Sequence, residues 1–323
     1  MIISASRRTD IPAFYSDWFA KRIEEGFFYN VNPFNAKKIK YVSLAPNNVD
    51  VIVFWSKNPK PILRHLPLLD LKGYSYYFQF TLNDYPKTFE PHVPDIEERV
   101  DTFKILSQHI GRHKVIWRYD PIILSSITPY EYHLEKLYKL SSQLSGYTNR
   151  LMISFVDFYG KVKLRLKKLQ EEHNVEILSF QESYSKGELH RFAEQLREIV
   201  IPQEIDVYTC AEIFDLDKAG IKHGSCIDGN LINKIFRTDK IFIKDKGQRK
   251  ECLCAESIEM GMYDTCKFKC NYCYANASPK RIDKNVANHL IDGPSLICNE
   301  YLKEQLKKEE KKLEVKRKQF NLF

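Results

Sequence analysis

No long apolar run occurs in this sequence of 323 residues. A membrane-spanning helix needs roughly 20 consecutive apolar residues, so we expect no membrane span. The start MIISASRRTD also lacks the pattern of a secretory signal peptide. We therefore expect a cytoplasmic protein that has no membrane partner.

The sequence also lacks internal repeats and low-complexity linkers before residue 250. A single α/β barrel takes about 250 residues, so the chain is long enough for one large domain. Hydrophobic residues make up 43% of the chain, which excludes a disordered class. We predict an α/β barrel body over 1–250, a cysteine-rich iron–sulfur loop with a closing strand over 251–298, and a charged helical tail over 299–323.

The net charge of +8 permits nucleic-acid binding but does not establish it. Residues 300–323 hold eight Lys/Arg and five Glu, so 8 − 5 = +3 of the surplus lies on the tail. We interpret this tail as a solvated helix of mixed charge, with contact to nucleic acid left open.

Short apolar runs alternate with amphipathic segments along the chain. The runs that predict strands span 1–6, 50–55, 74–80, 114–118, 150–155 and 206–210. Helical periodicity occurs near 13–26, 95–110, 129–145, 161–173 and 187–200. This alternation predicts βαβ units, and six or more of them favour a (β/α) barrel over a doubly wound open sheet.

Polar residues follow each predicted strand. In a parallel barrel these strand ends meet on one face, where barrel enzymes place their active sites. Gln79 and Arg118 lie within apolar strands, where a buried polar group needs a partner or a ligand. The catalytic candidates are Arg118, Asp120, Asp157 and Glu212, and the cofactor-binding candidates include Arg7, Arg8 and Gln79. Two simpler explanations stay open: solvated loop starts, or a structural ion pair of Arg118 with Asp120 or Glu212.

The chain has eight cysteines, two groups of which are closely spaced. This usage predicts metal or redox chemistry in a reducing compartment rather than disulfides. One group, Cys266, Cys270 and Cys273, forms a CxxxCxxC array. Three thiolates can hold a 4Fe-4S cluster and leave one iron open, whereas structural zinc sites and clusters normally use four ligands. A zinc knuckle or a chance spacing is the alternative.

The array resembles the cluster loop of the radical S-adenosylmethionine enzymes, and CxYCYA resembles the variant in relatives of spore photoproduct lyase. The resemblance implies that S-adenosyl-L-methionine chelates the open iron and that Tyr272 lies near the adenine. It further implies one-electron reduction to a 5′-deoxyadenosyl radical, with flavodoxin or ferredoxin as the electron donor. The substrate is not implied.

Four further cysteines, Cys210, Cys226, Cys252 and Cys254, would supply four soft ligands. Four thiolates close either a second iron–sulfur cluster or a structural zinc site. Their long separations give no spacing signature, and a cysteine on a strand can also be a small buried hydrophobe.

The whole of residues 1 to 278 resembles the uncharacterised family known as domain of unknown function 1848. The resemblance rests on segments in chain order: SASRRTDIPAFY, NPFN, VFWSKNP, YYFQFTLNDY, VIWRYDPI, SFVDFYGK, TCAE, CIDG and CxxxCxxCYAN. The family's recognised feature is a carboxyl-terminal cysteine cluster similar to the amino-terminal one of radical S-adenosylmethionine enzymes.

In those enzymes the cluster loop follows the first barrel strand, and a Gly-Gly-Glu segment after the second binds the methionyl amine. Here the loop comes late and no such segment is present. A circular permutation would reconcile the order, with 254–263 as the first strand and 1–6 as the second. We therefore predict that 255–263 pairs with the amino-terminal strand and that Cys270 lies over the same mouth as Arg7, Arg118 and Asp157.

Two other functions stay open at this point. One is a metal-stabilised nucleic-acid-binding module whose cysteines are structural. The other is a barrel hydrolase that uses Asp120, Asp157 and Glu212 with Mg²⁺ or Mn²⁺.

Overall fold

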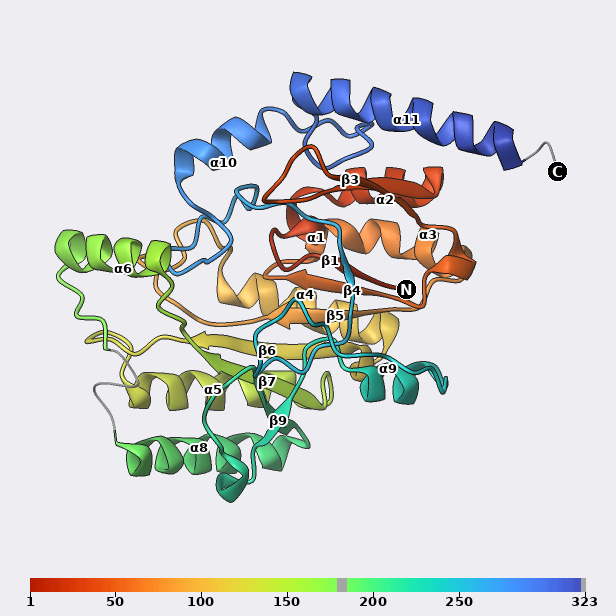
Figure 1. Cartoon of the computed structure of the whole chain (residues 1–323). Coiled ribbons are helices and arrows are strands. Elements are labelled where there is room, and N and C mark those ends of the chain that lie inside the picture. The colour runs from red at the N-terminus through yellow and green to blue at the C-terminus, as the bar shows by residue number, and fades with distance from the viewer. Residues whose placement is uncertain (179–184, 321–323) are drawn as a thin grey trace.

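The computed structural model describes residues 1–178 and 185–320 and contains an eight-stranded sheet (Figure 1). Every neighbouring pair in this sheet is parallel. In spatial order the strands are β10 (Ile258–Glu259), β1 (Ile2–Ala5), β4 (Val51–Ser56), β5 (Tyr76–Thr81), β6 (Val115–Ile122), β7 (Arg150–Phe155), β8 (Asp206–Cys210) and β9 (Lys222–Gly224). The α/β class and the six predicted strands are confirmed.

The strands are apolar because both faces of the sheet are covered, as is typical of parallel sheets. Successive side chains point to opposite faces. Ile3, Ile52 and Phe78 belong to the large core that the helices share. The other face carries a smaller apolar cluster, which contains Ile2 and Val51 and also three cysteines, Cys226, Cys252 and Cys254.

Helices follow the strands as the periodicity predicted. They are α1 (Ile11–Phe14), α2 (Ser16–Glu25), α3 (Leu66–Leu71), α4 (Ile96–Ile110), α5 (Tyr130–Leu144), α6 (Gly160–His173), α8 (Lys186–Val200), α9 (Gly229–Phe236), α10 (Pro279–Val286) and α11 (Glu300–Phe320). The single helix expected near 13–26 is two helices, because Tyr15 leaves helical geometry at φ −136° and ψ 24°. Gly26 then ends α2 at φ 75°, a conformation that favours glycine.

The carboxyl-terminal part of the chain returns to the amino-terminal part, as the blue and red elements of Figure 1 show. Strand β10 pairs with β1, with Ile3 opposite Ile258 and Ser4 opposite Glu259. The predicted pairing of 255–263 with the amino-terminal strand is thus confirmed. The strand itself is much shorter than the expected 254–263. Gly261 packs so closely on Ser6 that no side chain would fit there, which marks a close crossing instead of a continuing ladder.

The two ends of the sheet are β10 and β9, and within the described residues they share no strand ladder. A backbone hydrogen bond of 2.9 Å from Ala255 N–H to the Ile227 carbonyl connects the segments beside them. Closure into a complete barrel therefore does not follow from strand pairing alone.

A second, two-stranded antiparallel sheet was not predicted. It pairs β2 (Phe27–Val31) with β3 (Ile39–Ser43). The backbone N–H of Tyr29 donates to the Pro294 carbonyl at 2.8 Å, and the Trp18 indole donates to the Gly293 carbonyl at 2.7 Å. These bonds attach the segment before α11 to the first elements of the chain. The tail is helical through residue 320, and residues 321–323 lie outside the described residues.

Among the helices of the described ranges, none is both long and apolar enough to cross a membrane.

Candidate functional site

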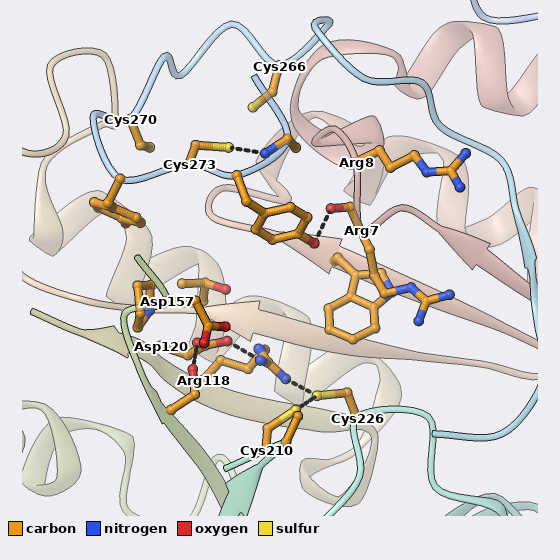
Figure 2. A pocket seen from close by; sticks show the side chains of 18 of the residues that line it. Arg7, Arg8, Arg118, Asp120, Asp157, Cys210, Cys226, Cys266, Cys270 and Cys273 are labelled. Atoms are coloured by element: carbon orange, nitrogen blue, oxygen red, sulfur yellow. Dashed lines mark hydrogen bonds and ion pairs between the residues drawn. The ribbon is translucent and has the colours of Figure 1, made fainter. Parts of the chain in front are cut away.

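A cavity of about 430 Å³ opens at the carboxyl ends of the parallel strands. Cys266, Cys270 and Cys273 lie on one side of it, on the loop after β10, and Arg118 with Cys210 and Cys226 lies opposite (Figure 2). The other predicted residues that line it are Arg7, Arg8, Asp120, Asp157, Cys252, Cys254 and Tyr272. The predicted position of the cysteine loop over the mouth of Arg7, Arg118 and Asp157 is confirmed.

The sulfurs of Cys266 and Cys273 receive backbone hydrogen bonds. Cys273 Sγ accepts from Ala275 N–H at 3.3 Å, and Cys266 accepts from the N–H groups of Phe268 and Asp10. Burial raises the pKa of Cys266 and of Cys270. These thiols therefore stay protonated at neutral pH unless a cation or metal stabilises the thiolate. The three thiols of Cys266, Cys270 and Cys273 in one loop fit the donor set of a 4Fe-4S cluster with an open iron.

Arg165, on helix α6, holds the loop from outside. Its Nε donates to the Asn271 carbonyl at 3.1 Å, and its two Nη atoms donate to the carbonyls of Asn276 and Cys273. Sequence reasoning missed Arg165 because it lies in KLRLKKL, which reads as a basic solvated helix face. The only signal in the sequence was an arginine between two leucines of a predicted helix.

The segment after β5 holds the loop from the other side. The Asn271 backbone donates to the Phe89 carbonyl at 3.0 Å, and its side-chain amide donates to the Thr88 carbonyl at 2.7 Å. Asn271 thus fixes the backbone of the loop directly before Tyr272.

Tyr272 is buried and strongly oriented. Its hydroxyl donates to Glu90, which also accepts from Lys57 Nζ at 2.7 Å, and the same ammonium lies 5.5 Å from the ring centroid. Burial alone would raise the pKa of Glu90, yet Lys57 and then Arg99 outweigh it and lower that pKa. Glu90 was also missed, because it follows β5 at a distance of nine residues.

Arg7 and Arg8 line the cavity beside the loop, on the right in Figure 2. Arg7 Nε lies 3.6 Å from Glu259, and the Arg7 carbonyl accepts from the Tyr274 hydroxyl at 2.8 Å. The Arg8 guanidinium lies 4.9 Å from the Tyr263 ring centroid. Arg7 is thereby fixed by an ion pair, whereas Arg8 is held by an aromatic face.

Arg118 forms the centre of the opposite side. Its guanidinium is buried, pairs with Asp120 and donates to Cys226 Sγ at 2.6 Å. Asp120 also accepts from Ser154. Burial would raise the pKa of Asp120, but Arg118 lowers it, so the carboxylate stays ionised. The structural ion pair of Arg118 with Asp120 is confirmed, and the alternative pair with Glu212 is not formed.

Two of the predicted residues do not line the cavity. Glu212 accepts from the Phe155 N–H at 2.8 Å, and burial raises its pKa to about 8. Gln79 is buried and donates to the Cys226 carbonyl at 2.6 Å. Asp157 does line the cavity, but it is half-exposed and paired with Arg249 at 2.8 Å.

The second cysteine group also comes together. Cys210 Sγ and Cys226 Sγ lie 2.6 Å apart, Cys226 contacts Cys254, and Cys254 contacts Cys252. Cys254 further accepts from Ile227 N–H at 3.4 Å, and hydrogen bonds from Cys226 and Cys252 lower its pKa. Over the part of the chain that the structure describes, no three His, Cys, Asp or Glu side chains are already spaced as ligands around one metal ion.

The model of the family described as "Domain of unknown function (DUF1848)" matches residues 2–275. The match spans most of the chain, so this protein belongs to that family, as the sequence resemblance indicated. A search of the curated proteins and a search of the solved structures found no match.

Proposed function

We propose that this protein is a radical S-adenosylmethionine-type enzyme that holds a 4Fe-4S cluster on Cys266, Cys270 and Cys273. The observation that carries the proposal is the position of all three sulfurs on one side of a cavity at the carboxyl ends of the strands. Ligand sites in parallel α/β folds lie at that end.

The strand order supports a permuted barrel of that type. The cysteine loop directly follows β10, and β10 lies at the end of the sheet beside β1. Counted from β10 across the sheet, the loop follows the first strand, as it does in the radical S-adenosylmethionine enzymes that it resembles. The residues after β1, Ser6, Arg7 and Arg8, then occupy the place of the second strand's ligand-binding segment.

When bound and reduced, a cluster with an open iron supplies the electron that cleaves S-adenosylmethionine to methionine and a 5′-deoxyadenosyl radical. The residues of this chain have other tasks. Arg165 and Asn271 fix the loop, and the Glu90 and Lys57 contacts hold the Tyr272 ring in one orientation for stacking on an adenine.

Arg8 is our choice for an anionic group of the cofactor or substrate, because guanidinium matches carboxylate and phosphate geometry. Arg7 is already engaged by Glu259, and Arg118 by Asp120. An electron donor such as flavodoxin or ferredoxin, in a reducing cytoplasm, completes the proposal.

The hydrolase alternative has less support from the geometry. A hard metal such as Mg²⁺ needs several free oxygen ligands. Asp120 and Asp157 are each paired with an arginine, and Glu212 does not line the cavity.

The test is anaerobic reconstitution with iron and sulfide, followed by spectra with and without S-adenosylmethionine and by assay of 5′-deoxyadenosine. We expect a 4Fe-4S spectrum that shifts with the cofactor, and slow cleavage after reduction. Cys270→Ala should lose the signal of this cluster and at least 100-fold of the cleavage, whereas Cys298→Ala, away from the cavity, should keep both. A reconstituted wild type with a verified cluster that neither shifts its spectrum nor cleaves the cofactor would refute the radical assignment.

A further inference from the structure

The four cysteines opposite the loop come from three separate segments. Cys210 ends β8, Cys226 follows β9, and Cys252 and Cys254 belong to the segment that leads into β10. Their thiols contact one another in the order 210, 226, 254 and 252, and all four line the cavity. Four thiols that meet at one cavity are the donor set that Zn²⁺ and iron–sulfur clusters prefer.

We propose that these four thiolates hold a second, closed metal centre of thiophilic type, either Zn²⁺ or an iron–sulfur cluster. The proposal does not depend on the radical chemistry, because it concerns a different set of ligands. A four-thiolate set leaves no open coordination position, so this centre does not bind S-adenosylmethionine.

The sulfur separations bear on the metal. In a tetrahedral zinc site with Zn–S bonds near 2.3 Å, the sulfurs lie about 3.8 Å apart. The Cys210 and Cys226 sulfurs are closer than that, at 2.6 Å, and they must move apart by about an ångström to admit an ion. The cavity beside them gives the space for that movement.

The surroundings of the sulfurs suit an anionic centre. Four thiolates around a divalent ion carry a net charge of about −2, which needs nearby donors. Arg118 Nη1 donates to Cys226 at 2.6 Å, and Ile227 N–H donates to Cys254 at 3.4 Å. Arg7 lines the same cavity as these four cysteines, so a second guanidinium lies on this cavity wall.

The proposed centre lies between the two ends of the sheet, which indicates a structural role. Cys210 and Cys226 belong to the β8–β9 end of the sheet, and Cys252 and Cys254 lie on the approach to β10 at the other end. These are the two ends that share no ladder among residues 1–178 and 185–320. A metal bound by all four would therefore add a further connection between the two ends of the sheet, beside the backbone hydrogen bond from Ala255 to Ile227.

The experiment uses the full chain with Cys266, Cys270 and Cys273 all changed to Ser, which isolates the second site. Samples are prepared without oxygen, loaded separately with Zn²⁺, with Co²⁺, and with iron and sulfide, and desalted before metal analysis. We expect either one Zn²⁺ per chain, with the intense visible Co²⁺ bands of a four-thiolate site, or a cluster spectrum with bound iron and sulfide. Cys298→Ser in the same background should leave the result unchanged.

Adding Cys252→Ser and Cys254→Ser to the triple variant should remove this metal, and so should Cys210→Ser with Cys226→Ser, which guards against a variant that fails to fold. Circular dichroism of each variant establishes folding. A folded triple variant that retains less than a tenth of an equivalent of zinc, and no cluster, overturns the proposal. Mass-spectrometric detection of Cys210–Cys226 and Cys252–Cys254 disulfides in protein isolated without oxygen overturns it as well. A wild type that has a verified cluster but does not cleave S-adenosylmethionine would refute the radical proposal for Cys266, Cys270 and Cys273. It would leave the proposal for the four-cysteine centre unaffected.

Discussion

The two sides of the cavity are both rich in cysteine, yet they are built in different ways. On the loop side, three cysteines within eight residues are presented by one turn. Arg165 donates to three carbonyls of this turn, and Asn271 of the turn donates to the Thr88 and Phe89 carbonyls. On the opposite side, four cysteines from three segments touch one another around a buried Arg118–Asp120 pair. The first arrangement is local, and the second exists only after the sheet has formed.

This difference predicts different sensitivities. A local loop loses its geometry when the hydrogen bonds that hold it are removed, while the sheet below it keeps its structure. An assembled site depends on the sheet, so changes in its buried charges reduce the stability of the whole domain.

The largest effect is expected for Arg118→Ala. It leaves Asp120 ionised and buried without its partner, and breaking such a pair costs about 3–5 kcal/mol of unfolding free energy. Arg249→Ala is the matched control, because its pair with Asp157 is about 40% exposed on both sides and surface pairs contribute about 0–1 kcal/mol. Urea denaturation measures both. Equal losses of unfolding free energy in the two variants would show that the buried Arg118–Asp120 pair contributes no more to stability than a surface pair.

Arg165→Ala should act on the loop side. It removes charge-assisted hydrogen bonds to three loop carbonyls, which we expect to cost about 2–4 kcal/mol locally. Hydrogen exchange should rise in residues 266–276 while β4 to β7 stay protected. Reconstituted iron on the loop should fall at least twofold, with Lys168→Ala on the same helix as control. Unchanged exchange in 266–276 would mean that the loop keeps its geometry without Arg165.

The unfolding free energy is expected to depend on pH through His133, on helix α5. Burial lowers the pKa of His133 from 6.5 to about 4, and its ring contacts the Tyr119 hydroxyl and the Ile123 carbonyl. The folded pKa lies below the unfolded one, so the stabilisation is present above pH 6.5 and is lost as pH falls through 4. We expect a loss of about 1–3 kcal/mol over that window. In His133→Gln the slope of unfolding free energy with pH should be shallower, and an identical slope would contradict this assignment.

The smallest effect is expected for Tyr272→Phe. The ring stays for stacking, and Glu90 keeps Lys57 as its partner, so only one hydrogen bond of about 1 kcal/mol is lost. Cofactor binding should weaken severalfold at most, whereas Tyr272→Ala should weaken it by about 1–3 kcal/mol with the cluster retained. Calorimetric titration with S-adenosylmethionine gives both values. Equal weakening by Phe and Ala would point to the hydroxyl instead of the ring.

The sequence was sufficient for the parts of the fold that depend on local patterns. The apolar runs gave the strands, and the CxxxCxxC spacing gave the loop, because neighbours in sequence must remain neighbours in space. The β2–β3 hairpin was missed, since its short strands pair only with each other and are anchored by the distant Pro294 carbonyl.

The same limit applies to the site. Glu90 and Arg165 lie 182 and 108 residues from the loop atoms they contact, Tyr272 and Cys273, and no period or motif connects them. Gln79 was noticed as a polar residue on an apolar strand, which correctly predicted a partner. That partner is the Cys226 carbonyl. The buried Gln79 amide is therefore explained by a hydrogen bond to the backbone and not by a ligand.

The place of β10 at the end of the sheet has a consequence for biosynthesis. Residues 1–224 leave the ribosome before β10 and its cysteine loop, and they contain the seven strands from β1 to β9 that form the rest of the sheet. The amino-terminal part of a domain can begin to fold during synthesis. The nascent sheet can therefore form first, with β1 as a temporary open edge, and β10 and the cysteine loop join it later. Three of the seven cysteines that line the cavity are therefore made only after nearly all of the sheet, so a metal centre on the loop, as proposed above, could be filled only at that late stage.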